Sequence, residues 1–193
     1  MSEDDRRKWN ERYAAGAYQA RTGESAWLRR WLPTARVGRA LDLACGMGRN
    51  ARYLAREGYR VDAVDISSEG LRRAAHLAES EGLQVNWLEC DLEHDLPPER
   101  TGYQVIVLFR YVNAPLLNEL ASRLAAGGYL IVEQHLRTDS QVAGPTNPDF
   151  RVSAGDLSGA AANLQILAAE ESIVEDPDGA RVALARLAAC KSD

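Results

Sequence analysis

Short apolar runs alternate along this chain with longer amphipathic segments. The runs predict buried strands and the amphipathic segments predict helices, in the pairs 39–44 with 49–57, 60–65 with 68–81, 103–110 with 115–125, and 128–135 with a helix after Ser153. A further strand at 85–90 precedes a loop through Pro97 and Pro98. Such alternation predicts a parallel sheet with right-handed crossovers and helices on both faces.

The two ends of the chain depart from this alternation. Residues 3–14 predict an amphipathic helix with acidic residues first and basic residues later, as the helix dipole favours. Residues 25–32 predict a second helix, which Pro33 ends. Two strand-like runs, 164–174 and 181–189, are joined by a strong turn sequence, Asp176-Pro177-Asp178-Gly179. We therefore expect seven strands, of which the last two form an antiparallel hairpin.

Length and composition are those of one globular domain. The chain has 193 residues, enough for a well-buried core, and no linker rich in Ser, Gly or Pro divides it. We expect a single domain over residues 1–193, in which residues 1–36 form an N-terminal helical lid segment.

Charge and cysteine usage exclude several classes of partner. The net charge of −5 argues against a nucleic-acid partner, since binding to phosphates depends on Lys and Arg. The longest wholly apolar run, residues 105–109, is too short to span a bilayer, and residues 1–6 lack the apolar stretch of a signal peptide. We expect a cytoplasmic protein without a membrane partner. Cys45, Cys90 and Cys190 are odd in number and lack metal-type spacing, so neither a disulfide nor a bound metal is expected.

The most informative chemistry lies at the end of the first predicted strand. Residues 40–50 combine this strand and Asp42 with a turn, containing Gly46 and Gly48, that opens a helix. Such glycines let the backbone bend sharply and approach a ligand, although a tight turn without a ligand is the alternative. A pyrophosphate would meet like charge from Asp42, whereas a sulfonium and an ammonium group would be attracted. The pattern therefore favours S-adenosylmethionine over a dinucleotide.

This segment resembles motif I of the class I S-adenosylmethionine-dependent methyltransferases. Three more landmarks follow in the order of that family: Asp65 after the second strand, Cys90-Asp91-Leu92 after the third, and a helix-Gly-Gly-strand step at 124–132. The resemblance implies a Rossmann-like α/β fold, with a seven-stranded, mostly parallel sheet and a C-terminal antiparallel hairpin. It also implies that Asp65 binds the ribose hydroxyls and that the third segment contacts the adenine amino group. The expected cofactor-binding residues are Asp42, Ala44, Gly46, Gly48, Asn50, Asp65, Ile66, Asp91, Leu92 and Phe109.

The methyl acceptor is expected at the carboxyl ends of the fourth and fifth strands. Arg110 offers a fixed charge for an anionic group and Tyr111 a flat ring with a hydroxyl, unless Arg110 pairs with a surface acid and Tyr111 packs on the loop. Glu133 and His135 point to the same side by strand alternation, and His135 is either a base for the acceptor or a structural residue. The catalytic candidates are Arg110 and His135, and the substrate candidates are Trp9, Tyr13, Tyr111, Asn113 and Arg181.

Within the class I family, the chain most resembles the small tellurite-resistance type. The likeness rests on residues 8–13, on 46–50 with 53–55, on 58–63, and on 150–151 ahead of 154–157. The His-Arg pair that this type carries near its last hairpin has no match here, and only Arg181 corresponds to a basic residue of that site. The resemblance therefore implies the cofactor but leaves tellurite in doubt as the acceptor.

The aromatic residues of the first helix admit two interpretations. Trp9 and Tyr13, four residues apart, form one stripe that either covers the cofactor as a lid or docks the helix on the domain.

The resulting hypothesis is an S-adenosylmethionine-dependent methyltransferase that acts on a small, soft or anionic acceptor. A thiol, a selenium or tellurium oxyanion or a metabolite would suit it, because in-line displacement then needs orientation and exclusion of water more than a base. A noncatalytic module that binds the same cofactor is one alternative. The other is an NAD(P)-dependent reductase that uses the Gly-x-Gly-x-x-Ala spacing of residues 46–51 and Asp65, which Asp42 and the hairpin argue against.

Overall fold

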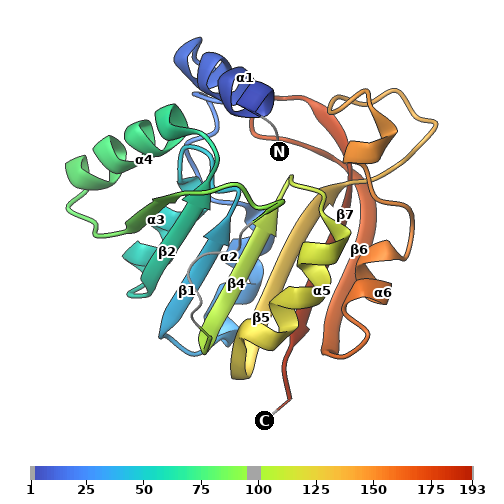
Figure 1. Cartoon of the computed structure of the whole chain (residues 1–193). Helices are drawn as coiled ribbons and strands as arrows, with labels where there is room; N and C mark the ends of the chain where they lie inside the picture. Colours follow the sequence, from blue (N-terminus) through green and yellow to red (C-terminus); the bar gives the residue numbers. More distant parts are fainter. Residues whose placement is uncertain (1–2, 95–100, 193) are drawn as a thin grey trace.

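The computed structural model of the chain describes residues 3–94 and 101–192, so the predicted loop through Pro97 and Pro98 lies outside the described residues. Within them, seven strands form one sheet in the order β3-β2-β1-β4-β5-β7-β6 (Figure 1). The strands are β1 (Arg39–Leu43), β2 (Arg60–Asp65), β3 (Asn86–Glu89), β4 (Tyr103–Phe109), β5 (Leu124–His135), β6 (Gln165–Glu175) and β7 (Arg181–Cys190).

The first five strands pair in parallel, and β7 pairs antiparallel with both β5 and β6. This arrangement confirms the predicted α/β fold with its C-terminal hairpin. The helices are α1 (Glu3–Ala14), α2 (Ala26–Trp31), α3 (Arg49–Arg56), α4 (Ser68–Ser80), α5 (Ala114–Arg123) and α6 (Asp156–Ala160), with 3-10 turns η1 (Leu32–Thr34) and η2 (Pro148–Phe150).

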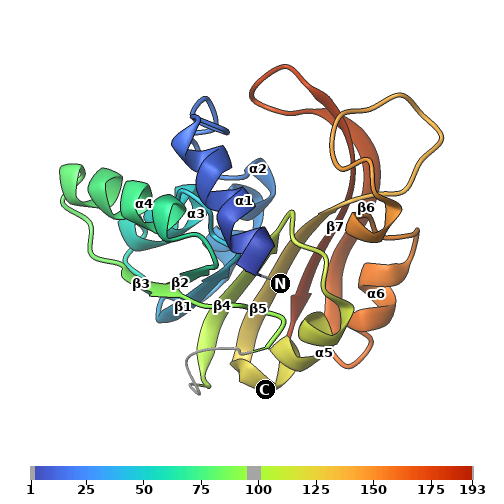
Figure 2. The same ribbon diagram turned by 45° about the horizontal axis from the view of Figure 1, so that its top comes forward.

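The central strands are apolar throughout because both of their faces are buried. In β4, Val105 and Val107 join the apolar cluster under α2 and α3, whereas Ile106 and Leu108 join the cluster under α5. Figure 2 shows α5 and α6 on one side of the sheet and α2, α3 and α4 on the other. Two-sided burial explains why the sequence shows continuous apolar runs there instead of strict alternation.

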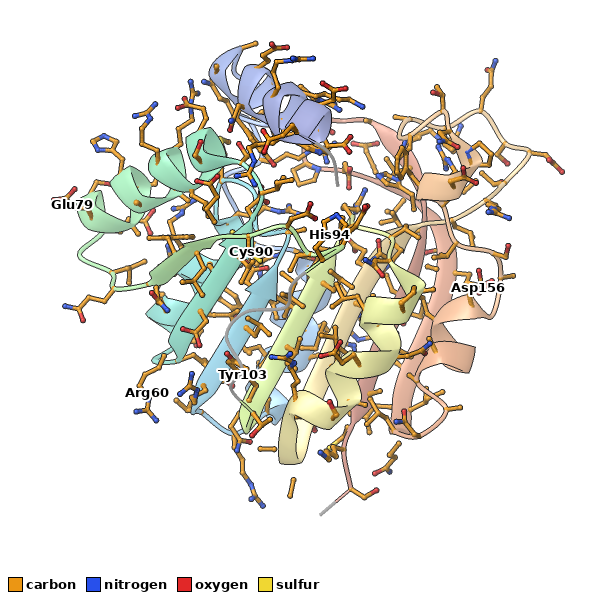
Figure 3. The ribbon with its side chains drawn as sticks, viewed as in Figure 1. Arg60, Glu79, Cys90, His94, Tyr103 and Asp156 are labelled. Atoms are coloured by element: carbon orange, nitrogen blue, oxygen red, sulfur yellow. The ribbon has the colours of Figure 1, made fainter. Side chains whose placement is uncertain are left out.

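The two edges of the sheet can be told apart in Figure 3. Arg60 and Tyr103 lie at the edge where the parallel strands begin, and Cys90 and His94 lie toward the edge where they end. Helix α1 lies at this second edge (Figure 1). In an open sheet of this kind the carboxyl edge is where ligands bind, so α1 lies beside the expected site.

The predicted boundaries differ most around the Gly-Gly step. Strand β5 begins at Leu124, four residues before the predicted start at 128, and pairs there with Tyr103 across a register shift. A Cβ on Gly128 would lie 2.7 Å from the carbonyl oxygen of Tyr103. The glycine is therefore part of the strand, at a point where the β4 and β5 backbones approach too closely for a side chain.

Candidate active site

The turn after β1 uses left-handed backbone at three of five successive positions. The φ angles are 52° at Ala44, 56° at Gly46 and 69° at Gly48. Ala44 is strained because it has a Cβ, and strain of this kind collects at functional sites. A Cβ on Gly48 would lie 2.5 Å from the ring of Trp87 in β3. The absent side chain of Gly48 therefore makes room for protein packing, while the turn itself directs the chain into α3.

Asp42 has a carboxylate oxygen that no hydrogen bond satisfies. The residue is 1% exposed, and its carboxylate accepts a hydrogen bond from the backbone N–H of Ala51 in the first turn of α3. Its Oδ2 has no partner among the described residues, and burial raises the pKa of Asp42 to about 8. Buried polar atoms are nearly always hydrogen-bonded, so this oxygen is suited to a cationic ligand group.

Asp65 holds the glycine turn against the end of β2. Its Oδ2 accepts a hydrogen bond from the N–H of Gly46 at 2.7 Å, and its Oδ1 accepts one from the N–H of Ser67 at 2.9 Å. Burial raises the pKa of this carboxyl, although the amide bonds favour its ionised form. The N–H of Ile66 is a third backbone donor to this carboxylate, which has about four acceptor positions, so room remains for a ligand hydroxyl. The structure therefore adds a bracing role that the sequence did not reveal.

Helix α1 covers this turn with Tyr13. A Cβ on Gly46 would lie 2.6 Å from the Tyr13 hydroxyl, and a Cβ on Gly70 would lie 3.1 Å from its ring. Trp9 stacks on Tyr13 with ring centroids 5.8 Å apart. Tyr13 is thus buried over the glycine turn. Trp9 and Tyr13, the two aromatic residues of the predicted stripe, therefore both lie on the side of α1 that faces this turn.

Asn10 fixes the position of α1, and the sequence analysis gave it no role. Its Oδ1 accepts hydrogen bonds from the Ser67 hydroxyl at 2.7 Å and from the N–H of Glu69 at 3.1 Å. These donors stand at the start of α4, directly after Asp65. The only sequence signal was the place of Asn10 within residues 8–13, which carry the family resemblance.

The other predicted cofactor residues lie at the same edge and already have protein partners. Asn50 accepts a hydrogen bond from the N–H of Ser25 at 2.9 Å, and Asp91 accepts one from the N–H of Glu93 at 2.9 Å. Three further predicted residues are buried: Ile66, Leu92 and Phe109. Their contacts with a cofactor stay predictions.

Arg110 is held by buried acidic residues and is not a free charge. Its Nε donates to Glu133 at 3.0 Å and its Nη2 to Asp176 at 2.9 Å. Arg21 also pairs with Asp176, at 3.0 Å. Arg110 therefore pairs with acids, but Glu133 and Asp176 are buried and not the surface acid of the stated alternative. We call Arg21, Arg110, Glu133 and Asp176 the ion cluster.

Arg110 itself has a strained backbone. Its φ of 60° is left-handed, and its N–H donates to the carbonyl of Glu133 at 2.7 Å. This conformation turns the chain sharply at the end of β4 and brings the guanidinium back onto β5.

His135 lies against the ion cluster on the same side as Glu133, as strand alternation predicted. Its Nε2 is 3.5 Å from Arg110 Nη1. Burial, with the nearby charges of Arg110 and Arg151, lowers the pKa of His135 to about 4. A group with this pKa is a weak base at neutral pH, so the predicted role as general base is not favoured.

Tyr111 and Asn113 make contacts within the protein. Tyr111 packs against the cluster under α5, and its carbonyl accepts a hydrogen bond from Gln134 at 2.7 Å. Asn113 caps α5 by accepting a hydrogen bond from the N–H of Leu116 at 3.0 Å. The Tyr111 ring thus packs on the core and not on the loop, and its role toward an acceptor stays a prediction.

Arg181 does not join the other acceptor candidates. It is exposed, and it stands three positions before Leu184, which pairs with His135 across β5 and β7. Since paired residues share a face and alternate residues change face, the Arg181 side chain leaves β7 on the face opposite to His135.

Metal and membrane features are absent from the part of the chain that the structure describes. Residues 3–94 and 101–192 contain no group of three metal-type ligands, and their cysteines are free thiols. None of the helices in these ranges has the length and apolarity needed to cross a bilayer.

Comparison with known proteins identifies the central part of the chain. Residues 40–128, which run from β1 into β5, match the family described as methyltransferase domain. A ubiquinone biosynthesis O-methyltransferase from a Caulobacter species is 31% identical over 105 residues, which cover 52% of this chain and 42% of the relative. The matched part of this chain therefore spans less than half the length of that curated relative.

Solved structures extend the likeness to nearly the whole chain. TehB from Haemophilus influenzae has a TM-score of 0.75 and 22% identity, over 95% of this chain and 67% of that one. A geranyl diphosphate C-methyltransferase from Streptomyces coelicolor, whose structure contains S-adenosyl-L-homocysteine, has a TM-score of 0.64 and 18% identity over 87% and 76% of the two chains. The fold is thus that of class I methyltransferases and resembles TehB. Fold and domain family together confirm the predicted cofactor, S-adenosylmethionine.

Proposed function

We propose that this protein transfers the methyl group of S-adenosylmethionine to a small-molecule acceptor. The observation that carries the proposal is the unpaired, buried oxygen of Asp42 beside the left-handed turn of a methyltransferase domain. A cationic cofactor without phosphate would satisfy that oxygen, and a pyrophosphate would not.

Each element of the carboxyl edge has a task in this proposal. Asp42 attracts the cationic end of the cofactor, and Asp65 accepts hydrogen bonds from the ribose hydroxyls while it braces Gly46. Asp91 stands where the adenine amino group is expected. The bound cofactor supplies a methyl group on a positively charged sulfur, which is a good leaving group.

The proposed acceptor is soft or already ionised. His135 is a weak base, and Glu133 is held by Arg110 at 3.0 Å, so neither is poised to remove a proton. The contribution of the chain is then orientation and exclusion of water, with α1 as the lid segment over the turn; orientation alone can lower a barrier by about 7 to 11 kcal/mol.

Two measurements test this function. Calorimetry should give tighter binding of S-adenosylhomocysteine than of NAD; the opposite order would reject the cofactor assignment in favour of a reductase. A screen of small thiols, oxyanions and carboxylic acids for S-adenosylhomocysteine release should then identify an acceptor. Cofactor binding without turnover of any compound would instead support a noncatalytic binding module.

A further inference from the structure

Arg49 is a cation of the carboxyl edge whose charge is not neutralised by an ion pair. It is the first residue of α3, directly after the left-handed turn at Gly48, and it is half-buried. Its Nη1 donates a long hydrogen bond to the carbonyl of Gly23, at 3.5 Å, and among the described residues no carboxylate oxygen lies within 4.0 Å of its guanidinium. Arginine is seldom buried without a paired anion, so most of its donors are left for a ligand.

The other arginines of this region differ from Arg49 in this respect. Arg21 and Arg110 belong to the ion cluster and donate to its carboxylates at 2.9 to 3.0 Å. Burial lowers the pKa of Arg49, and the charges of this cluster act on it as well: Glu133 and Asp176 raise the pKa, whereas the two arginines lower it. Arg49 is thus close to the cluster, but the carboxylates there are held by other guanidiniums.

Arg49 also lies near the buried carboxylate of Asp42. Burial raises the pKa of Asp42 to about 8, and among the charged side chains that modify this value Arg49 has the largest effect and lowers it. The two residues nevertheless do not form an ion pair, and Asp42 Oδ2 has no partner in the described chain. One turn of backbone therefore carries an unpaired acceptor and unpaired donors.

The backbone of α3 adds positive potential at the same place. Gly48 at the N-cap has no side chain to cap the helix, so the first N–H groups depend on other acceptors. Asp42 accepts from one of them, the N–H of Ala51. The helix terminus favours an anion beside Arg49, and the unpaired oxygen of Asp42, in a residue that is 1% exposed, requires a cation or donor there too.

An amino-acid group meets both requirements, because it carries an ammonium and a carboxylate on one carbon atom. The residues that bind these two charges must then stand close together without neutralising each other, as Asp42 and Arg49 do. The cofactor of the proposed function ends in such a group. A ligand with only one of the charges would leave either Asp42 or Arg49 without a partner.

We propose that Arg49 binds the carboxylate at the amino-acid end of S-adenosylmethionine, while Asp42 binds the ammonium group. This inference rests on the proposed function, since it concerns the cofactor of that reaction. It makes Arg49 a specificity-determining residue that favours nucleosides with a carboxylate over those without one.

Three nucleosides separate the contributions of the two charges. S-adenosylhomocysteine has both the carboxylate and the ammonium group, its decarboxylated analogue has only the ammonium group, and methylthioadenosine has neither. In calorimetry the wild type should bind S-adenosylhomocysteine about tenfold more tightly than the decarboxylated analogue, because the analogue leaves Arg49 unpaired. This comparison needs no variant, and equal affinities for the two ligands would overturn the proposal.

Substitution of Arg49 should remove that preference. Arg49→Gln should weaken the binding of S-adenosylhomocysteine about tenfold and change that of the other two ligands less than about twofold. Arg49→Lys keeps the charge and should retain most of the affinity. Arg56→Gln is the matched control, because it removes the same charge at the other end of α3, from a residue that pairs with Glu81, and it should alter none of the three affinities.

Two outcomes of these titrations would contradict the assignment. An equal loss of affinity for all three ligands in Arg49→Gln would mean that the residue only supports the structure of the turn. An unchanged affinity for S-adenosylhomocysteine, together with weaker binding of an anionic acceptor, would mean that the guanidinium belongs to the acceptor.

Failure of this inference can be told apart from failure of the proposed function. Asp42→Asn tests the cofactor site itself and should weaken both ligands that carry the ammonium group. If the wild type binds S-adenosylhomocysteine without preferring the carboxylate, the inference fails and the methyltransferase proposal stands. If the preference depends on Arg49 but no acceptor is methylated, the inference stands and the chain is a noncatalytic module. Tighter binding of NAD would reject both.

Discussion

Asp42 and Asp65 are both buried carboxylates beside the glycine turn, but their surroundings differ. Backbone N–H groups donate to both oxygens of Asp65, whereas Asp42 has one oxygen without a partner in the described chain. A protein holds an unpaired buried carboxyl at a cost in stability, and such costs are typical of binding sites. Asp65 therefore holds the backbone of the turn through hydrogen bonds, whereas Asp42 keeps an oxygen that can bind a ligand.

The pKa of Asp42 gives a prediction about pH. Burial raises this pKa from 3.8 to about 8, so between these values the folded state holds a proton that the unfolded state releases. Stability should therefore fall as pH rises through this window, and Asp42→Asn should flatten the fall in urea unfolding curves. Cofactor binding should release a proton near pH 7, which calorimetry in buffers of different ionisation enthalpy measures. A proton uptake, or none, would contradict the assignment.

Substitution of Asp65 should affect both binding and folding. Asp65→Ala leaves the N–H groups of Gly46 and Ser67 without their acceptor, so the free energy of unfolding should fall by about 1 to 3 kcal/mol in addition to the loss of cofactor affinity. From the sequence alone we would expect the loss of affinity without the loss of stability. Urea unfolding measures the loss of stability, and calorimetry measures the loss of cofactor affinity. If Asp65→Ala unfolds at the wild-type midpoint, the turn does not depend on the Asp65 hydrogen bonds.

At the scale of elements, Asn10 ties helix α1 to the start of α4 beside the turn. Asn10→Ala removes hydrogen bonds from Ser67, Ser68 and Glu69. We expect S-adenosylhomocysteine to bind about tenfold more weakly, equivalent to about 1.4 kcal/mol. Glu11→Ala, at an exposed neighbouring position, is the matched control. If both variants bind like the wild type, α1 does not act as a lid.

The sequence predicted the elements better than their ends and contacts. Strand periodicity and the turn at Asp176-Pro177-Asp178-Gly179 were enough for the strand count and the hairpin, because both are local signals. The early start of β5 at Leu124 was missed, since it depends on pairing with Tyr103. The pairing of Arg110 with Asp176, 66 positions away, leaves no local pattern either. Positions at strand ends were thus predictable, but the partners of their side chains were not.

At the scale of the whole molecule, the ion cluster joins four distant parts of the chain. Arg21 precedes α2, Arg110 ends β4, Glu133 belongs to β5, and Asp176 begins the hairpin turn. The side chain of Asp176 is 8% exposed, so its loss would leave two guanidiniums partly desolvated and short of negative charge. The cluster therefore ties the hairpin turn to the carboxyl edge.

Asp176→Asn should lower the free energy of unfolding by about 2 to 4 kcal/mol. It removes the negative partner of two buried ion pairs and leaves both guanidiniums charged. Asp178→Asn is the control: this carboxylate is 33% exposed and pairs only with Arg21 among the described residues, so a loss below about 1 kcal/mol is expected. Both are measured by urea unfolding. Equal losses in the two variants would mean that the cluster contributes no more than a surface ion pair.

The position of β7 between β5 and β6 has a consequence for synthesis on the ribosome. Translation produces β6 before β7, yet in the finished sheet β6 pairs only with β7 among the described strands. Until the segment Arg181–Cys190 has left the exit tunnel, β5 has an open edge and β6 has no partner. The nascent chain is then vulnerable to strand-to-strand aggregation, which a holding chaperone would relieve. The sheet can therefore be completed only after β7 has emerged.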